Sequence, residues 1–310
     1  MRTVLHVGAH KTATSLIQKY FRDEVAPAAN LPIAVVGRTD TNQLIGWGQH
    51  LEQQPERLRE RLEGELRTKQ YVLVSHENTI GRPFDPEVSG LYPHADRLSK
   101  ALFDISDPFD PLVVFYIRPL ADFVESFYLQ TVHQGSTSSF EEWFATIDHT
   151  ALSWTGVVEA LEKSFGSDRV VVGDFREISD GQDSYLSSFF RLTGLPTPGK
   201  VRYRPVRNAS VSVAGLELAL QMNPFLETKE QRRAARTSPQ SHFSTRRGAR
   251  ARPMPPDVRD MLTRQDAAGY EALAQRSDDR QAAPARDPPA PSRRAARACA
   301  EGSQRVPVPP

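Results

Sequence analysis

The sequence predicts an α/β protein with a central, mainly parallel β-sheet flanked by helices. Short apolar segments rich in β-branched residues alternate with segments whose apolar residues recur at helical spacing. This alternation is typical of doubly wound sheets, in which helices connect parallel strands. Ligands of such sheets bind beyond the carboxyl ends of the strands. Polar residues that directly follow a strand are therefore the candidate site residues.

The first strand ends near Val7 and passes through a turn over 8–15 into a helix. N–H groups in the first turn of a helix lack partners within it, and the helix dipole places positive charge behind them. Gly8 permits close backbone approach and Lys11 adds a mobile positive charge. The pattern indicates a phosphate or sulfate site. The residues expected to form it are Gly8, His10, Lys11, Thr12, Ala13, Thr14 and Ser15.

One alternative to this site remains open at the level of sequence. Thr12 could merely cap the helix while Lys11 is solvated. The turn is not a Walker A loop, because no glycine directly precedes Lys11 and the glycine-to-lysine spacing is too short. This disfavours an ATP or GTP site.

The remaining elements follow in order. Further strands are predicted at 31–36, 71–75, 111–117 and 169–175. Helices are predicted in the charged segment 50–68, as one helix or a pair, and at 94–105, 120–133, 155–165, 183–193 and 213–222. Pro119 is expected at a first-turn position of its helix, where its missing N–H costs little. Ser139 and Glu142 form a predicted capping box for a short helix.

Composition sets several bounds. The chain has 310 residues and a net charge of +1. This near balance of charge does not indicate a strongly charged partner. The longest apolar run, Leu112 to Ile117, is too short to span a bilayer. The first strand begins close to Met1, which leaves no room for a signal peptide. The single cysteine, Cys299, permits no intramolecular disulfide or cysteine-rich metal site. We therefore expect a soluble, cytoplasmic protein, and the oligomeric state is not indicated.

The composition changes near Thr228. We expect one domain over 1–227, followed by an Arg/Pro/Ala-rich tail over 228–310 that is mostly disordered, because it has too few apolar residues to form a core. Within the tail, apolar residues at helical spacing indicate a helix over 256–273 that could dock on the domain. The tail lacks interleaved aromatic residues, so no nucleic-acid partner is expected.

A second candidate anion site follows the strongest predicted strand. Arg118 leaves the end of the strand at 111–117, and Ser126 lies eight residues later on the following helix. Both groups can face one phosphate if the helix runs back past the strand end. Alternatively, Arg118 forms a surface ion pair and Ser126 is an ordinary helix residue.

These two segments resemble the sulfotransferases that use 3′-phosphoadenosine 5′-phosphosulfate (PAPS). The sequence His-Val-Gly-Ala-His-Lys-Thr-Ala-Thr-Ser over 6–15 resembles their 5′-phosphosulfate loop, usually Lys-Thr-Gly-Thr-Thr or Lys-Ser-Gly-Thr-Thr. Ala13 replaces the usual glycine, which is tolerable if this residue has helical dihedral angles. Ser15 replaces the usual threonine and keeps the hydroxyl group. The strand, Arg118-Pro119, Asp and Ser126 resemble the family's 3′-phosphate motif.

The resemblance covers about residues 1–226 and implies a P-loop-like sulfotransferase fold. Within the family, the sequence most resembles the bacterial or carbohydrate-type branch. It implies transfer of a sulfuryl group from PAPS to a hydroxyl, or to an amine, of a carbohydrate or small metabolite. The product would be adenosine 3′,5′-bisphosphate. Lys11 would stabilise the leaving group, and no metal is required.

Three residues are candidates for the general base. Glu77 is the first, because it follows the strand at 71–75 and resembles the glutamate used by several carbohydrate sulfotransferases. His76 is the second and His10 the third. Glu77 could instead cap a turn, and His76 could be a core histidine. Arg204 and Arg207 are candidates to replace the basic segment with which the cytosolic branch of the family covers its nucleotide.

Two other functions remain open. A nucleotide-dependent phosphotransferase would need a metal-binding carboxylate at a strand end, for which Asp174 is the candidate. A non-catalytic nucleotide- or polyanion-binding protein would keep Lys11, Arg118 and Ser126 and use no base. The alanine at position 13 favours this second alternative.

Overall fold

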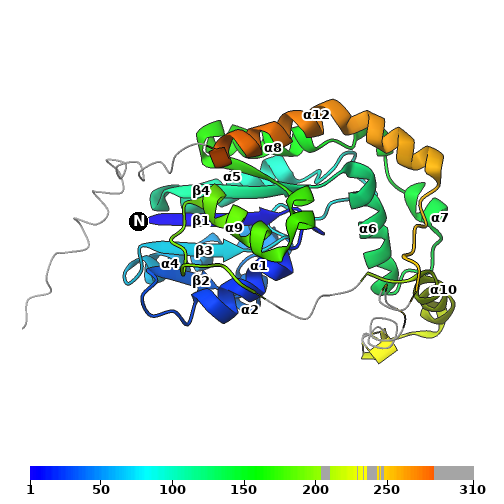
Figure 1. Ribbon diagram of the computed structural model, residues 1–310, viewed down its shortest axis with the longest axis horizontal. Coiled ribbons are helices and arrows are strands. Elements are labelled where there is room, and N and C mark those ends of the chain that lie inside the picture. Colours follow the sequence, from blue (N-terminus) through cyan, green and yellow to red (C-terminus); the bar gives the residue numbers. More distant parts are fainter. Residues whose placement is uncertain are drawn as a thin grey trace, which may run out of the picture.

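Five parallel strands form one sheet in the computed structural model, in the order β2-β3-β1-β4-β5 (Figure 1). The structure describes residues 1–203, 210–228, 230–232, 234–235, 243, 245 and 248–282. The strands are β1 (Arg2–Gly8), β2 (Ile33–Val36), β3 (Tyr71–Ser75), β4 (Pro111–Ile117) and β5 (Val170–Asp174). β1 is central, and its neighbours β3 and β4 carry the other two predicted sites at their carboxyl ends. The predicted fold class, an α/β protein with a parallel central sheet flanked by helices, is confirmed.

Helices connect the strands and cover both faces of the sheet. They are α1 (Thr14–Tyr20), α2 (Arg38–Leu44), α3 (Gln49–Gln53), α4 (Pro55–Leu66), α5 (Ala95–Ser106), α6 (Leu120–His133), α7 (Phe140–Phe144), α8 (Trp154–Phe165), α9 (Gln182–Thr193), α10 (Val213–Met222) and α12 (Pro256–Ala282). None of the described helices is long and apolar enough to cross a membrane.

The two faces of the sheet pack against different helices, because alternate residues of a strand point to opposite sides. In β4, Val114 and Tyr116 pack in a cluster with α1 and α9. Phe115 and Ile117 pack in a second cluster with α4, α5, α6 and α8. All seven residues of β4 are buried. The sheet is thereby held rigidly beneath the residues that follow its carboxyl ends.

Most predicted elements are observed with small shifts, and three details differ. The charged segment 50–68 forms two helices, α3 and α4, because Pro55 begins a new helix. Pro119 lies just before α6 and not within its first turn. The helix that follows β1, α1, ends at Tyr20, and the chain continues directly as a π-helix over Phe21–Val25. The predicted capping box of Ser139 and Glu142 is present at the start of α7.

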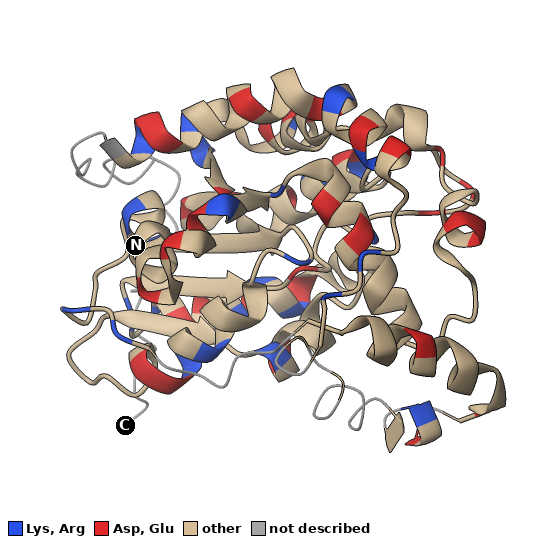
Figure 2. Ribbon diagram, turned by 45° about the vertical axis from the view of Figure 1, so that its right-hand side comes forward, with Lys and Arg blue, Asp and Glu red and all other residues tan. Residues whose placement is uncertain are grey.

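The long helix α12 lies along the β5 side of the molecule (Figure 1). It contacts β5, α6, α8 and α9, and its Leu262, Tyr270 and Leu273 are buried in the same cluster as α8. Its outer surface carries both acidic and basic residues (Figure 2). The helix expected over 256–273 is thus observed, extends to Ala282 and forms part of the main core. Residues 283–310 lie outside the described residues.

Candidate active site

A cavity of about 540 Å³ lies at the carboxyl ends of the strands and brings together the sites that the sequence analysis treated separately. From the turn after β1 it is lined by His10, Lys11, Ala13, Thr14 and Ser15, from the end of β3 by Glu77, and from β4 and α6 by Arg118 and Ser126. Carboxyl ends of neighbouring parallel strands meet at one edge of the sheet, and this explains the convergence.

The turn after β1 is shaped by two residues with positive φ. Lys11 has φ 63° and Ala13 has φ 57° and ψ 24°. Ala13 therefore lies in the left-handed region, and the condition under which alanine would be tolerable there, right-handed helical dihedral angles, is not met. This conformation is the reason a glycine is usual at such a position, because a Cβ atom there is crowded by backbone.

Five consecutive N–H groups, those of residues 11–15, donate no backbone hydrogen bond to any described residue. The neighbouring groups are all bonded: the N–H of Ala9 donates to the Tyr116 carbonyl, and that of His10 to the Tyr92 hydroxyl. Buried backbone donors are normally paired. A run of N–H groups beside a lysine and facing a cavity is suited to bind an anionic ligand with several oxygens.

Lys11 is half-buried, and the Arg118 side chain lies close to it, with a guanidinium nitrogen bonded to the Lys11 carbonyl. Burial and the charge of Arg118 lower the pKa of Lys11 to about 8, although Glu77 raises it. The ammonium group is therefore still mainly protonated at neutral pH. Two cations forced together in a buried cavity create a strong requirement for a negatively charged ligand.

Two other predicted residues of the turn have structural functions. Thr12 is fully buried and does not line the cavity; its hydroxyl donates to the Ala9 carbonyl at 2.6 Å. Gly8 does not line it either. Gly8 has φ 124°, and a Cβ atom there would lie 3.4 Å from the carbonyl oxygen of Glu77. That distance is an ordinary contact, so the positive φ, which strains any residue with a side chain, is what favours glycine at position 8.

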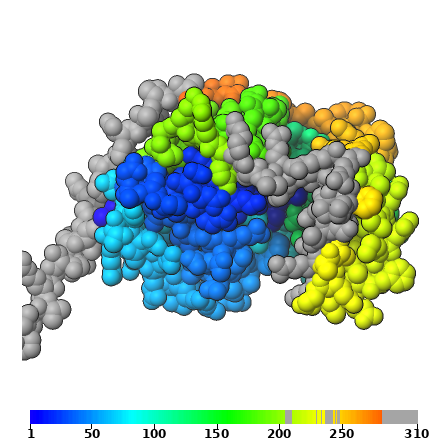
Figure 3. Space-filling view, turned by 60° about the horizontal axis from the view of Figure 1, so that its bottom comes forward, coloured from blue at the N-terminus to red at the C-terminus, as the bar shows by residue number. Residues whose placement is uncertain are grey.

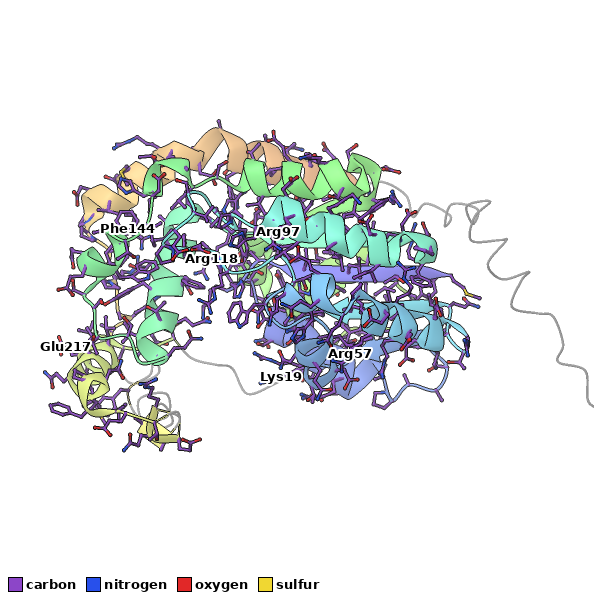
Figure 4. The ribbon with its side chains drawn as sticks, turned by 180° about the vertical axis from the view of Figure 1, so that it is seen from behind. Lys19, Arg57, Arg97, Arg118, Phe144 and Glu217 are labelled. Atoms are coloured by element: carbon purple, nitrogen blue, oxygen red, sulfur yellow. The ribbon has the colours of Figure 1, made fainter. Side chains whose placement is uncertain are left out.

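Arg118 is held by several elements at once. One guanidinium nitrogen donates to the Lys11 carbonyl at 2.9 Å, and the group lies over the Phe175 ring at 4.8 Å. The Trp154 indole donates to the Arg118 carbonyl at 2.7 Å. Burial lowers the pKa of Arg118 to about 10, so the side chain is cationic at neutral pH. Figure 4 labels Arg118, which is buried.

Glu77 is the one base candidate whose carboxylate is both in the cavity and ionised. Burial raises its pKa, but a backbone hydrogen bond and the nearby Arg38 outweigh burial and hold the pKa below its usual range. One carboxylate oxygen lies 3.6 Å from the Arg38 guanidinium, and the other accepts a hydrogen bond from Gln18 at 3.3 Å.

The two histidine candidates fit the function of base less well. The Nδ1 and Nε2 atoms of His10 both have partners, the Tyr92 hydroxyl and the Asn78 side chain, each at 2.8 Å. His76 is buried outside the cavity lining, with Nε2 bonded to Asn42 at 2.8 Å. Burial lowers the pKa of each histidine to about 4. Both rings are therefore neutral at pH 7, and neither presents a free nitrogen to the cavity.

Several cavity residues escaped sequence reasoning. Gln130 lies one helical turn beyond Ser126 on α6 and could have been found from that spacing. Another part of the lining comes from the segment after β5. These residues also lie past the carboxyl end of a strand, the position that indicated the other sites. The lining residues of this part and of the α1 side are Leu16, Lys19, Phe175, Ile178, Ser179, Gly181 and Gln182, and Ser210, which precedes α10, also lines the cavity. Arg204 and Arg207 lie outside the described residues.

Helix α12 contributes no residue to the cavity lining but contacts three residues or segments that lie next to lining residues or hold them. Arg259 forms ion pairs with Asp122 at 2.8 Å and Glu125 at 2.7 Å, both on α6 before Ser126. Asp266 accepts a hydrogen bond from the backbone N–H of Trp154, whose indole holds Arg118. The Tyr270 hydroxyl donates to Asp174, directly before Phe175.

Comparisons with known proteins include a distant likeness to a solved structure. No family model matches the chain, and no curated protein sequence matches it significantly. Among solved structures, the chain is similar to the crystal structure of a sulfotransferase from Alicyclobacillus acidocaldarius, with a TM-score of 0.44 and 16% identity, covering 76% of this chain and 96% of that one. A likeness at this level assigns neither an activity nor a ligand to the chain.

Proposed function

We propose that the chain is a PAPS-dependent sulfotransferase that transfers a sulfuryl group to a hydroxyl, or an amine, of a carbohydrate or small-metabolite acceptor. The observation that carries this proposal is a single cavity lined both by the turn around Lys11 and by the pair Arg118 and Ser126, with Glu77 facing it. A nucleotide with separate anionic groups at its 5′ and 3′ positions fits two such anion-binding sites.

The cavity residues divide naturally between the two ends of this cosubstrate. Lys11, Thr14, Ser15 and the N–H groups of 11–15 would bind the 5′-phosphosulfate. Arg118 and Ser126 would bind the 3′-phosphate. The 3′-phosphate distinguishes PAPS from ATP and AMP, so Arg118 is the residue on which cosubstrate selectivity would depend.

The chemical step follows from these positions. As the acceptor oxygen forms a bond to sulfur, the bond from sulfur to the 5′-phosphate oxygen breaks, and the electron pair stays on the phosphate. Glu77 takes the acceptor proton as general base. Lys11 and the loop N–H groups stabilise the negative charge that develops on the leaving phosphate, which is the function of magnesium in kinases. Adenosine 3′,5′-bisphosphate is released.

A non-catalytic binding protein is the second candidate, favoured by the left-handed alanine at position 13. That residue makes the turn costlier to form without removing any anion-binding group. The ionised Glu77 in the cavity has no use in a protein that only binds a polyanion, and it favours catalysis. A phosphotransferase has less support, because both carboxylate oxygens of Asp174 are already bonded to Tyr270 and Arg176.

Replacing Glu77 separates catalysis from binding. In Glu77→Gln we expect the affinity for adenosine 3′,5′-bisphosphate to stay within about twofold, while its formation from PAPS in the presence of an acceptor mixture falls about 100-fold or more. Glu63→Gln, on α4 away from the cavity, serves as the control and should keep full turnover. A wild-type protein that binds the bisphosphate but never produces it from PAPS would support the binding protein instead.

A further inference from the structure

A second cavity, of about 270 Å³, is lined by α1, which also lines the cavity described above. It is bounded by α1, the π-helix that follows it, the carboxyl end of β2 and the end of β3. Its lining residues include Ser15 and Lys19, which also line the first cavity. The two cavities therefore adjoin along α1. Figure 3 shows this part of the surface in blue, and Figure 4 labels Lys19.

The second cavity adjoins the group proposed as general base. Gln18 and Arg38 both line this cavity, and both contact the Glu77 carboxylate. Glu77 itself lines the first cavity. A ligand in the second cavity would thus approach the carboxylate that must take its proton, while the sulfuryl donor approaches from the first.

The charges around the second cavity all have one sign. Lys19, Arg22 and Arg38 line it, and no described aspartate or glutamate does. The Arg38 side chain is 59% exposed and only 3.6 Å from Glu77, so it is free to reorient toward a ligand. Arg22 is bonded to its neighbour Asp23 and is 64% exposed. Apolar residues, including Val35 and Leu73, also line it and form its apolar wall.

We infer that this cavity is the acceptor subsite and that it selects a small hydroxyl-bearing acceptor with a carboxylate or similar anionic group, such as a uronic acid. The inference rests on the proposed sulfotransferase function and names its substrate class. Arg38 and Arg22 would bind the anion, the apolar wall would pack against the face of the acceptor ring, and Glu77 would meet its hydroxyl. An uncharged sugar would form no ion pair with Arg38 or Arg22, which would keep their present partners, Glu77 and Asp23.

The test compares methyl β-D-glucuronide with methyl β-D-xyloside, which has the same ring hydroxyls and no carboxylate. With PAPS as donor, we expect kcat/KM for the glucuronide to exceed that for the xyloside about tenfold or more. In Arg38→Gln and in Arg22→Gln this preference should shrink several-fold. Arg57→Gln, which removes a charge from α4 on the opposite face of the sheet and lines neither cavity, should keep it.

The preference ratio is the decisive readout, because a general loss of activity in Arg38→Gln would change both acceptors alike. Equal use of the two acceptors, sulfation of neither, or a preference that survives both arginine substitutions would overturn the inference. Binding of adenosine 3′,5′-bisphosphate is measured in parallel. If the bisphosphate binds and no acceptor preference is found, the acceptor assignment alone fails; if it does not bind, the proposed function fails and the acceptor assignment with it.

Discussion

Ala13 shows how a single residue can set the cost of the anion-binding turn. Its φ of 57° is strained for alanine, whereas glycine adopts this region freely. The strain precedes α1 directly and is adjacent to the N–H groups that face the cavity. Substitution by glycine relieves it without changing any charge or hydroxyl in the turn.

We therefore predict that Ala13→Gly stabilises the protein by about 0.5–1 kcal/mol, since the relief of strain exceeds the added entropy of the unfolded chain. Urea denaturation measures this difference. The control is Ala160→Gly within α8, where glycine should instead destabilise by about 1 kcal/mol. A loss of stability in Ala13→Gly would show that the turn does not have the described conformation.

Lys11 makes anion binding depend on pH. Its pKa is lowered to about 8, so the unliganded protein loses this positive charge as the pH rises through 8. Because an anion favours the charged form, binding raises the pKa of Lys11, and the protein takes up protons on binding at pH 8.

We expect the affinity for adenosine 3′,5′-bisphosphate to fall about tenfold between pH 7 and pH 9. Calorimetry in buffers of different ionisation enthalpy measures both the affinity and the proton uptake. In Lys11→Arg the affinity should stay nearly constant over this range, because a guanidinium group remains protonated. A flat profile in the wild type, with no proton uptake, would contradict the described environment of Lys11.

At the scale of elements, α12 stabilises the segments that line the cavity. Through Arg259 it fixes the start of α6, through Trp154 it supports Arg118, and through Tyr270 it holds the segment after β5. Glu125 is almost fully buried, and Arg259 is its counter-charge. Loss of that partner leaves a buried carboxylate uncompensated at the base of the helix that carries Ser126.

Arg259→Gln is therefore expected to weaken adenosine 3′,5′-bisphosphate binding about tenfold while AMP affinity changes little, since only the 3′-phosphate contacts depend on α6. Competition binding with the two nucleotides measures the ratio, and circular dichroism confirms folding. Arg276→Gln, which removes an ion pair with Glu162 elsewhere on α12, is the matched control. An equal loss of affinity for both nucleotides would show that Arg259 stabilises the protein in general and does not position the 3′-phosphate site.

At the scale of the whole molecule, the sequence was most informative where local pattern and strand-end position agree. β3, β4 and α6 and the cavity positions of Lys11, Glu77, Arg118 and Ser126 all followed from apolar periodicity and from the rule that sites lie past strand ends. These features depend on residues close together in the chain.

Features that depend on distant contacts could not be predicted. The left-handed conformation of Ala13 is set by the turn geometry, not by an alanine's own preference. The burial of His76 and the bonding of both His10 nitrogens depend on Asn42, Tyr92 and Asn78. A helix over 256–273 that could dock on the domain was expected from its apolar spacing, but its extension to Ala282 and its packing partners, α6 and β5 among them, depend on distant contacts.

The central claim is that one cavity recognises a nucleotide by phosphates at both its 5′ and 3′ positions. Calorimetric titration of adenosine 3′,5′-bisphosphate, AMP and ATP into wild type, Arg118→Ala and Ser126→Ala tests it most directly. We predict that the bisphosphate binds about 100-fold tighter than AMP, and that both substitutions reduce this difference. If the bisphosphate binds no more tightly than AMP to the wild type, the proposed cosubstrate is wrong and the turn around Lys11 binds some other anion.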